Sequence, residues 1–287
     1  MSEYMSENKK NNHLDPGLYV VSTPIGNLSD ITLRALDVLK QSDYVLCEDT
    51  RHSLKLLNFY KIKKKLVSFH KFNETKKCKE IFDDIEGGKI ISLISDAGTP
   101  LISDPGEFLV KLAREKKIKV IPVPGPSAVT AAISVAGFSS KFFFFGFLSK
   151  KTKERTQELE SLCKINNSIV LYLPARDLKK SLEDFKIYFE NRMIFIAREI
   201  TKLHETYLSG TAEELLEKTG ANDLKGEITV VISNKSVDPK KEEDINLEYE
   251  INLLINKMSS KDMAEYLAKK LKISKKIIYQ NILDLEK

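Results

Sequence analysis

The chain has 287 residues, enough for two domains with separate cores, and its hydrophobic content of 42% is typical of a globular protein rather than a disordered one. The formal net charge of +5 is mild, but basic residues cluster in short runs such as 61–65 and 150–153, which favours a polyanionic partner, although solvated faces are the commoner explanation of such runs. Since no apolar run approaches the roughly twenty residues of a membrane helix and the N-terminus lacks a hydrophobic signal segment, we expect a cytoplasmic protein without membrane association.

The first part of the chain alternates between apolar runs and amphipathic segments, which is typical of a parallel sheet. Residues 1–16 are polar and are predicted to form a flexible extension. Residues 17–138 form the predicted N-terminal α/β domain. We expect its strands at 18–21, 44–47, 90–95 and 120–121, and its helices at about 30–40 with Ser29 or Asp30 as the cap, through 54–57, at 107–116 and at 127–135.

A C-terminal α/β domain is predicted for residues 139–233. Its first strand, at 142–147, contains a run of phenylalanines that is typical of a buried strand rather than an aromatic binding site. Further strands are expected at 169–173, 193–197 and 228–232, and helices at 152–164, 178–189 and 212–218. A charged linker at 234–250 leads to a helical tail domain at 251–287. The expected fold class is therefore α/β, with two domains and a small C-terminal helical appendage.

Three loops rich in proline and glycine each follow a predicted strand of the first domain, at 22–27, 95–106 and 122–127. Glycine reaches backbone angles that are closed to other residues and proline fixes its own, so such loops can bring peptide groups against a ligand. Connections between strands and helices ordinarily need roughly two to six residues, and the loop at 95–106 is about twice as long. Because ligands of open α/β sheets bind outside the carboxyl ends of the strands, we expect one cofactor site here, the alternative being purely structural loops.

These loops, in this order, closely resemble those of the tetrapyrrole methylase family of S-adenosylmethionine-dependent enzymes. The resemblance runs from about residue 18 to 232 and is carried by segments 23–35, 47–52, 95–106 and 122–127. Within the family, the match is to the ribosomal RNA small-subunit methyltransferase I branch, which 2′-O-methylates a cytidine in the decoding region of 16S ribosomal RNA. The resemblance therefore implies an rRNA methyltransferase that acts on the small ribosomal subunit, uses S-adenosylmethionine and forms a homodimer.

The resemblance also implies a donor site in the cleft between the two domains. The implied donor-binding residues are Ile25, Asp96, Ala97, Gly98, Thr99, Ile102, Ser127 and Ala128 of the first domain, and Leu173 and Ile200 of the second, near the adenine. We expect exposed peptide groups of 97–99 and 127–128 to grip the donor without a metal. The three widely spaced cysteines fit neither a disulfide framework nor a zinc site. One departure from the branch is the segment 172–177, which lacks its usual glutamate and histidine and leaves Arg176 as a shifted substitute for a phosphate-facing charge.

Methyl transfer to a ribose requires activation of its hydroxyl group, because this group is a poor nucleophile with a pKa well above neutral. A nearby base could take its proton, or a cation could lower its pKa. The candidate catalytic residues are Glu48, Asp49, Arg51 and Asp104, all on loops of the first domain. The alternative for Glu48 and Asp49 is that they cap a helix.

Candidate RNA contacts lie in the second domain and in the tail. Lys150, Lys151, Lys153 and Arg155 are predicted to meet RNA phosphates, unless they form an ordinary solvated face. Two rival functions fit the same patterns: methylation of a tetrapyrrole such as a corrin precursor, because the donor site would look the same, and non-catalytic RNA binding by a protein that has kept the fold. The basic loops and the tail favour RNA over a tetrapyrrole.

Overall fold

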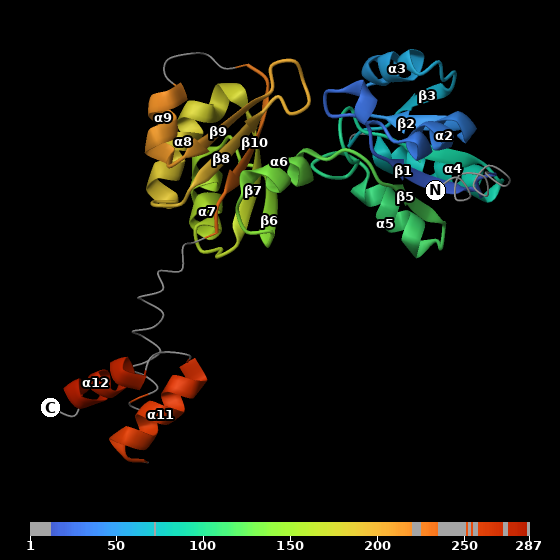
Figure 1. Cartoon of the computed structure of the whole chain (residues 1–287). Helices are drawn as coiled ribbons and strands as arrows, with labels where there is room; N and C mark the ends of the chain where they lie inside the picture. Colours follow the sequence, from blue (N-terminus) through green and yellow to red (C-terminus); the bar gives the residue numbers. More distant parts are fainter. Residues whose placement is uncertain are drawn as a thin grey trace, which may run out of the picture. The chain divides into compact units, whose positions relative to one another are not determined.

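The computed structural model describes residues 13–71, 73–219, 225–234, 251, 254, 258–271 and 275–285. The chain divides into two compact units, Met1–Asn234 and Lys235–Lys287. The first unit contains two sheets with their helices (Figure 1), so the two predicted α/β domains share one unit. Of the predicted linker at 234–250, only residue 234 lies within the described residues, as do only 13–16 of the predicted N-terminal extension.

The first sheet is parallel, as predicted, with the strand order β3-β2-β4-β1-β5. Its strands are β1 (Gly17–Val21), β2 (Tyr44–Cys47), β3 (Lys65–Ser68), β4 (Ile90–Leu93) and β5 (Val120–Val123). The elements between them are η1 (Leu28–Asp30), α2 (Leu33–Gln41), α3 (Thr50–Phe59), α4 (Glu74–Glu86) and α5 (Glu107–Glu115). Successive strand residues point to opposite faces, so Leu18 packs against α4 and α5 whereas Tyr19 packs against α2 and α3. The sheet is therefore buried on both faces.

The second sheet is mixed, with the order β6-β7-β10-β8-β9. Its strands are β6 (Phe142–Phe147), β7 (Ser168–Pro174), β8 (Ile194–Arg198), β9 (Thr206–Gly210) and β10 (Glu227–Ile232). The pair β6–β7 is parallel, and the pairs β7–β10, β10–β8 and β8–β9 are antiparallel. In this mixed sheet, side chains still alternate between two faces, and the apolar side chains of each face must be buried by other elements.

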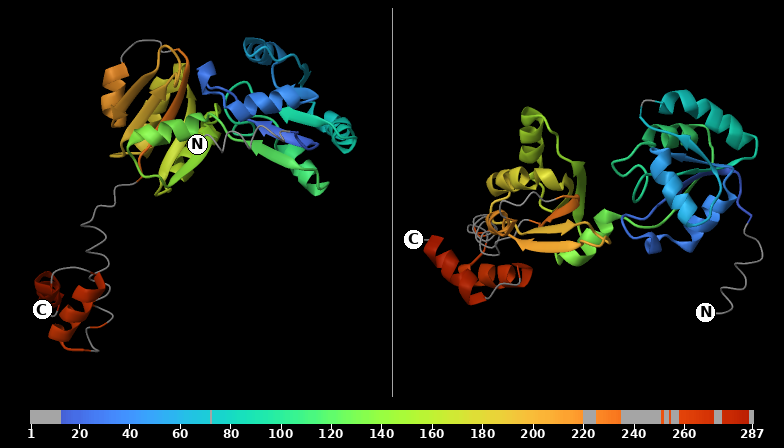
Figure 2. Two further views of the ribbon diagram at one scale, coloured as in Figure 1. Left: turned by 45° about the vertical axis from the view of Figure 1, so that its right-hand side comes forward. Right: turned by 90° about the horizontal axis from the view of Figure 1, so that it is seen from above.

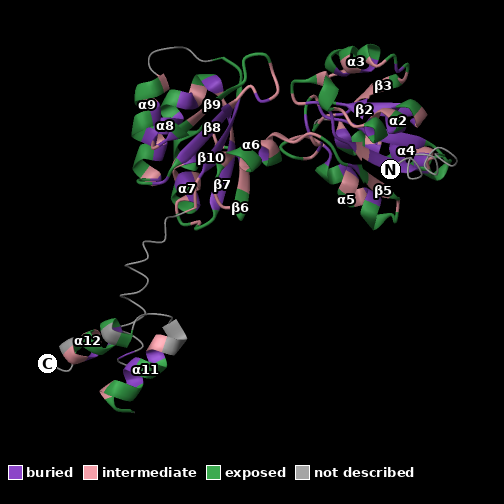
Figure 3. Cartoon of the chain, viewed as in Figure 1, coloured by how far each residue is buried: buried purple, intermediate pink, exposed green. Residues whose placement is uncertain are grey.

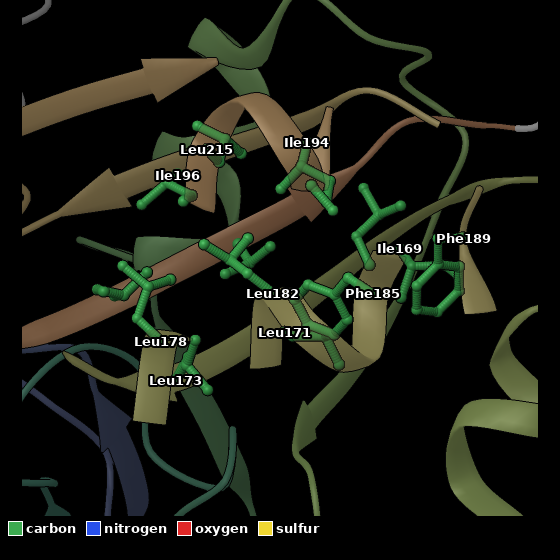
Figure 4. Packing of buried hydrophobic residues seen from close by; sticks show 14 of the residues in the cluster. Ile169, Leu171, Leu173, Leu178, Leu182, Phe185, Phe189, Ile194, Ile196 and Leu215 are labelled. Carbon is green, nitrogen blue, oxygen red and sulfur yellow. The ribbon is translucent and has the colours of Figure 1, made fainter. Parts of the chain in front are cut away.

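Helices cover both faces of the second sheet (Figure 2). On one face lies α6 (Ala128–Ala136), which packs Val129 and Ala132 against Val170 and Val231. On the other lie α7 (Thr152–Leu162), α8 (Leu178–Tyr188), which follows η2 (Ala175–Asp177), and α9 (Ala212–Thr219). Figure 4 shows the core on that face, formed by side chains of β7, β8, α8 and α9: Ile169, Leu171, Leu173, Leu178, Leu182, Phe185, Ile194, Ile196 and Leu215.

Several elements differ from the prediction. The first long helix begins at Leu33 rather than near residue 30, because the Thr32 side chain caps it by accepting a hydrogen bond from the Ala35 N–H at 3.1 Å. The preceding residues form η1 instead, with Asn27 as its cap. The prediction also lacked β3, α4 and β9. Strands β3 and β9 lie at sheet edges and are only partly buried, which leaves a weak hydrophobic pattern.

The predicted strand at 142–147 is confirmed, but its predicted burial is wrong. Strand β6 is an edge strand, and Figure 3 shows exposed residues along it. Phe142, Phe143 and Phe147 are exposed to 37%, 42% and 55%. Phe144 and Phe145 are partly buried, on the two opposite faces. The aromatic residues therefore favoured a strand at 142–147, as predicted, but the position of β6 at the sheet edge left several of them exposed.

The second unit contains the predicted helical appendage. Helices α11 (Ser260–Leu271) and α12 (Lys275–Leu285) pack on each other through a small apolar core formed by Ile251, Met263, Ala264, Leu267, Ile278 and Ile282. Ser259 caps α11, since its hydroxyl accepts a hydrogen bond from the Asp262 N–H at 3.2 Å. In the described part of the chain, no helix has the length and apolar character needed to cross a membrane.

Candidate functional site

The three proline- and glycine-rich loops meet at one edge of the first sheet. They follow β1, β4 and β5, which are neighbours in the sheet and run parallel, so their carboxyl ends lie side by side. The Thr99 hydroxyl contacts the Ser22 hydroxyl at 3.1 Å and donates a hydrogen bond to the Pro126 carbonyl at 3.3 Å, which ties the three loops together. The predicted convergence is confirmed.

A cleft of about 430 Å³ opens at this edge, between the loops of the first sheet and strands of the second. All residues that the resemblance assigned to the methyl donor line it, namely Ile25, Asp96, Ala97, Gly98, Thr99, Ile102, Ser127, Ala128, Leu173 and Ile200. Of the candidate catalytic residues, Glu48 and Asp104 line it as well. The cleft therefore brings together residues that lie far apart in the sequence.

Two loops join the walls of the cleft. The Asn27 N–H donates a hydrogen bond to the Thr201 hydroxyl at 3.0 Å. Gly26 leaves room for this contact, because an added Cβ would lie only 2.4 Å from Lys202 Cγ and 3.0 Å from the Ile200 carbonyl oxygen. This contact holds the loop that carries Ile25 against the loop that carries Ile200.

One end of the cleft is acidic. Burial, with smaller contributions from the charges of Glu48 and Asp96, raises the pKa of the Asp104 carboxyl to about 6 against an opposing hydrogen bond from Ser95. Asp96 accepts a hydrogen bond from the Asp49 N–H at 3.3 Å, which links the loop after β4 to the loop after β2. A carboxyl group with a pKa near neutral is suited to exchange a proton with a bound hydroxyl.

Asp49 and Arg51 lie outside the lining of this cleft. Asp49 caps α3 by accepting a hydrogen bond from the Arg51 N–H at 2.8 Å, and its carboxylate also pairs with the Arg51 guanidinium at 2.8 Å. This pairing lowers the pKa of Asp49 well below its ordinary value. The helix-cap alternative therefore describes Asp49, whose carboxylate also pairs with Arg51 outside the lining of the cleft.

The expected use of the Gly98 peptide groups in gripping a ligand also needs correction. Gly98 donates its N–H to the Thr23 carbonyl at 3.0 Å and accepts the Thr23 N–H at 2.8 Å. Both groups are thus used within the protein. Gly98 has a φ of +79°, so its contribution is to shape the loop.

The candidate RNA contacts separate into two kinds. Lys150, Lys151 and Lys153 are exposed, around the start of α7, although Lys151 pairs with Glu154 at 2.9 Å. Arg155, by contrast, is only 8% exposed and pairs with Asp184 at 2.6 Å. Its guanidinium also donates to the Ser181 hydroxyl at 3.0 Å, so Arg155 ties α7 to α8 instead of facing a phosphate. Arg176 is exposed in η2.

Sequence reasoning missed part of the lining. The remaining lining residues come mainly from β6, β7 and β10 and from the loop after β8: Ser103, Phe147, Tyr172, Pro174, Ala197, Glu199, Lys202, Gly226, Glu227, Ile228 and Thr229. Ser103 lies in the predicted loop 95–106, and Tyr172 and Pro174 lie in segment 172–177, which the family resemblance had singled out. Phe147 belongs to the run of phenylalanines at 142–147, which was predicted to be a buried strand. Among the described residues, no group of three or more histidine, cysteine, aspartate or glutamate side chains is arranged to hold a metal ion.

The family of this chain follows from a comparison with family models. The model of the tetrapyrrole (corrin/porphyrin) methylases matches residues 17–216. The chain belongs to this family. Its members are methyltransferases, and S-adenosylmethionine is the methyl donor of this enzyme.

The alignments to two relatives cover those proteins almost from end to end. The methylase is 47% identical over 219 residues to a protein of Thermotoga maritima named ribosomal RNA small subunit methyltransferase I, which covers 76% of this chain and 98% of that protein. A protein of the same name from a Synechocystis species is 38% identical over 273 residues, covering 94% of this chain and 98% of the relative. The methylase therefore belongs to the small-subunit methyltransferase I branch of the family.

Solved structures support the fold of the methylase. A diphthine synthase aligns with a TM-score of 0.59 at 14% identity, covering 75% of this chain and 89% of that one. The uroporphyrin-III C-methyltransferase of Thermus thermophilus aligns with a TM-score of 0.54 at 20% identity, over 79% of this chain and 98% of the other. These likenesses show a shared fold.

The cleft fits the chemistry of S-adenosylmethionine. Its apolar wall, which includes Ala128, Leu173 and Ile228, suits a planar adenine ring. The carboxyl groups of Asp96 and Glu48 at its acidic end suit the positive charges of a sulfonium and an ammonium group. Residues from both sheets are needed to build this combination.

Proposed function

We propose that this enzyme methylates the ribose 2′-oxygen of a cytidine in the decoding region of 16S ribosomal RNA within the small ribosomal subunit. The observation that carries the proposal is the match to the Synechocystis relative, which is named for the small-subunit RNA and spans 94% of this chain. The ribose position and the cytidine rest on the resemblance of the loop motifs to this branch. The relatives' names favour RNA over a tetrapyrrole substrate.

In this proposal, the donor is held by the three loops, by the apolar wall that includes Leu173, and by Ile200 in the loop after β8. When bound, S-adenosylmethionine supplies an electrophilic methyl group. The oxygen–methyl bond forms as the sulfur–methyl bond breaks, and the hydroxyl proton must leave. Asp104 is the proposed acceptor of that proton, because its partly buried carboxyl group lies in the cleft and has a pKa of about 6. Glu48 is the second carboxylate available at this end.

The RNA contacts in the proposal are Lys150, Lys151 and Lys153, together with the helical unit. The lysines follow β6 in sequence, and the end of β6 lines the cleft, so cations lie outside the donor site on an adjoining loop. Phosphate contacts position a nucleic acid without selecting its sequence. We also propose that the enzyme is a cytoplasmic homodimer, on the strength of the family resemblance.

The test is methyl transfer to purified small ribosomal subunits that lack this modification. Subunits, enzyme and isotopically labelled S-adenosylmethionine are incubated, and the RNA is digested to nucleosides. The expected product is 2′-O-methylcytidine. A methyl group on a base would overturn the reaction, transfer to a corrin precursor instead would favour the tetrapyrrole alternative, and RNA binding without transfer would favour the non-catalytic one.

A further inference from the structure

The end of strand β6 carries a bulge that reorients its last aromatic residue. In the pairing of β6 with β7, Phe144 lies beside Val170, Gly146 beside Leu171 and Phe147 beside Tyr172, which leaves Phe145 as an extra residue. Because side chains alternate along a strand, Phe144 and Phe147 would point to opposite faces without this extra residue. The bulge therefore places both beside residues of one β7 face.

Glycine is needed at this bulge. Gly146 has a φ of +89°, a backbone conformation that other residues rarely adopt. An added Cβ would lie 3.1 Å from Ser103 Oγ, so the end of β6 approaches the loop that carries Asp104. The bulge thus sets the strand end against the acidic end of the cleft.

The Phe147 ring contacts Tyr172 but remains open to solvent. The two ring centroids are 5.4 Å apart and the ring planes are inclined by 52°, so the rings do not stack in parallel. Phe144, on the same strand as Phe147, also contacts the Tyr172 ring, with centroids 5.1 Å apart and planes inclined by 69°. Phe147 is 55% exposed although it lines the cleft. A large apolar ring that is fixed at a cleft yet uncovered is available to a planar ligand.

Phe147 and Tyr172 lie near Asp104, the proposed proton acceptor. Tyr172 and Asp104 both line the cleft, and the Asp104 carboxylate is close enough to add to a rise in the pKa of the Tyr172 hydroxyl that burial causes. Tyr172 therefore stays neutral. The donor residues Leu173 and Ile200 line the same cleft from β7 and from the loop after β8, which leaves Phe147 at its β6 edge.

We propose that Phe147, supported by Tyr172, is the platform on which the base of the target nucleotide stacks once it has left its RNA stack, so that its ribose faces Asp104. This inference rests on the proposed function and adds to it a positioning residue. Aromatic side chains bind unstacked bases through their ring faces, largely independently of base identity. An enzyme that acts on one nucleotide of a folded RNA must hold that nucleotide out of its stack.

The test compares three substitutions of Phe147 with a matched control on the same strand. Phe147→Ala removes the ring, Phe147→Leu keeps apolar bulk without a ring, and Phe147→Tyr restores an aromatic face. Phe143→Ala is the control, because Phe143 is 42% exposed on β6 and lies outside the cleft lining. For each, we would measure kcat and KM for small subunits, the affinity for S-adenosylmethionine by calorimetry, and the binding of a fluorescent single-stranded cytidine-containing oligonucleotide.

Phe147→Ala and Phe147→Leu are expected to lower kcat/KM for subunits by roughly 10- to 100-fold, mainly through KM, and to weaken oligonucleotide binding. Phe147→Tyr should recover most of both, and Phe143→Ala should resemble the wild type. Donor affinity should stay unchanged throughout, which also shows that the variants fold. Full activity of Phe147→Leu would overturn the inference, as would a parallel loss of donor affinity. Failure of the wild type to methylate subunits would count against the proposed function alone, because the oligonucleotide series still tests the ring.

Discussion

Thr23 and Gly98 exchange both of their peptide hydrogen bonds, at 2.8 and 3.0 Å, and this bridge joins the loop after β1 to the loop after β4. Gly98 has a φ of +79°, and an added Cβ would lie 3.3 Å from Ile25 Cγ2 on the lining of the cleft. The position therefore couples a backbone requirement to the shape of the cleft.

Gly98→Ala is expected to destabilise the protein by about 1–2 kcal/mol, because a left-handed backbone is unfavourable for alanine. It should also weaken S-adenosylmethionine binding by roughly three- to tenfold, since Ile25 must move. Urea denaturation and calorimetry measure the two effects. The matched control is Gly88→Ala, where φ is +95° and no described atom lies within 4 Å of the new Cβ. It should lose stability but keep donor affinity, and an equal loss of affinity in both variants would contradict the assignment.

The pH dependence of methyl transfer should reflect Asp104. A base acts only when it is deprotonated, and the Asp104 pKa is raised to about 6, so single-turnover rates should be level near pH 8 and fall as the pH drops through about 6. Asp104→Asn should lower the rate by roughly 10²- to 10⁴-fold. It should also remove the inflection. A wild-type rate that stays constant from pH 8 to 5 would exclude Asp104 as the base.

Asp104→Asn should also raise the free energy of unfolding at pH 8, although it lowers activity. The folded protein holds the Asp104 proton more tightly than the unfolded chain does, because the pKa rises from 3.8 to about 6 on folding. Stability therefore decreases as pH rises from about 4 to 6, and the ionised group remains unfavourable above that range. Because the group is only partly buried, we expect the variant to gain about 1–2 kcal/mol at pH 8 and much less near pH 4.5. Urea denaturation at the two pH values measures this gain, and a loss of stability at pH 8 would contradict it.

The exposed lysines after β6 should govern salt-dependent RNA binding. In a Lys150/Lys151/Lys153 triple alanine variant, the slope of log affinity for small subunits against log salt should decrease by roughly 0.7 to 0.9 for each phosphate contact that is lost. Donor affinity should be unchanged, because these lysines lie outside the cleft lining. Filter binding across a salt series measures the slope. An unaltered slope would remove these lysines from the interface.

Arg155 should behave differently from these lysines. Its pair with Asp184 at 2.6 Å is largely buried, with the two side chains 10% and 25% exposed. Arg155→Ala leaves Asp184 without this partner and should destabilise the protein by about 2–4 kcal/mol. Denaturation by urea measures the loss. The salt slope of the folded variant should match the wild type, and a reduced slope with unchanged stability would show instead that Arg155 meets RNA.

The three loops that line the cleft could be predicted from local sequence, whereas Leu173 and Ile200 were implied only by the family resemblance. Proline restricts and glycine widens the range of backbone angles at the positions where they occur. Several of them directly after an apolar run therefore predict a loop such as 95–106. Parallel strands then bring the ends of such loops to one edge, and the structure places all the implied donor residues on one cleft. Asp49 and Arg155 could not be assigned in this way, because a charged side chain near a site has the same sequence appearance whether it caps a helix, pairs internally or faces a ligand.

The sequence by itself determined the alternation of elements, the parallel first sheet and the family, because these depend on periodicity and on residues that are close along the chain. Only the tertiary structure decided which of the charged groups are available. The raised pKa of Asp104 depends on burial and on charges from other loops. The exposure of Phe147 depends on β6 being an edge strand with a bulge at Gly146. Burial and strand position are properties of the packed chain, and they arise from contacts between residues that the sequence keeps far apart.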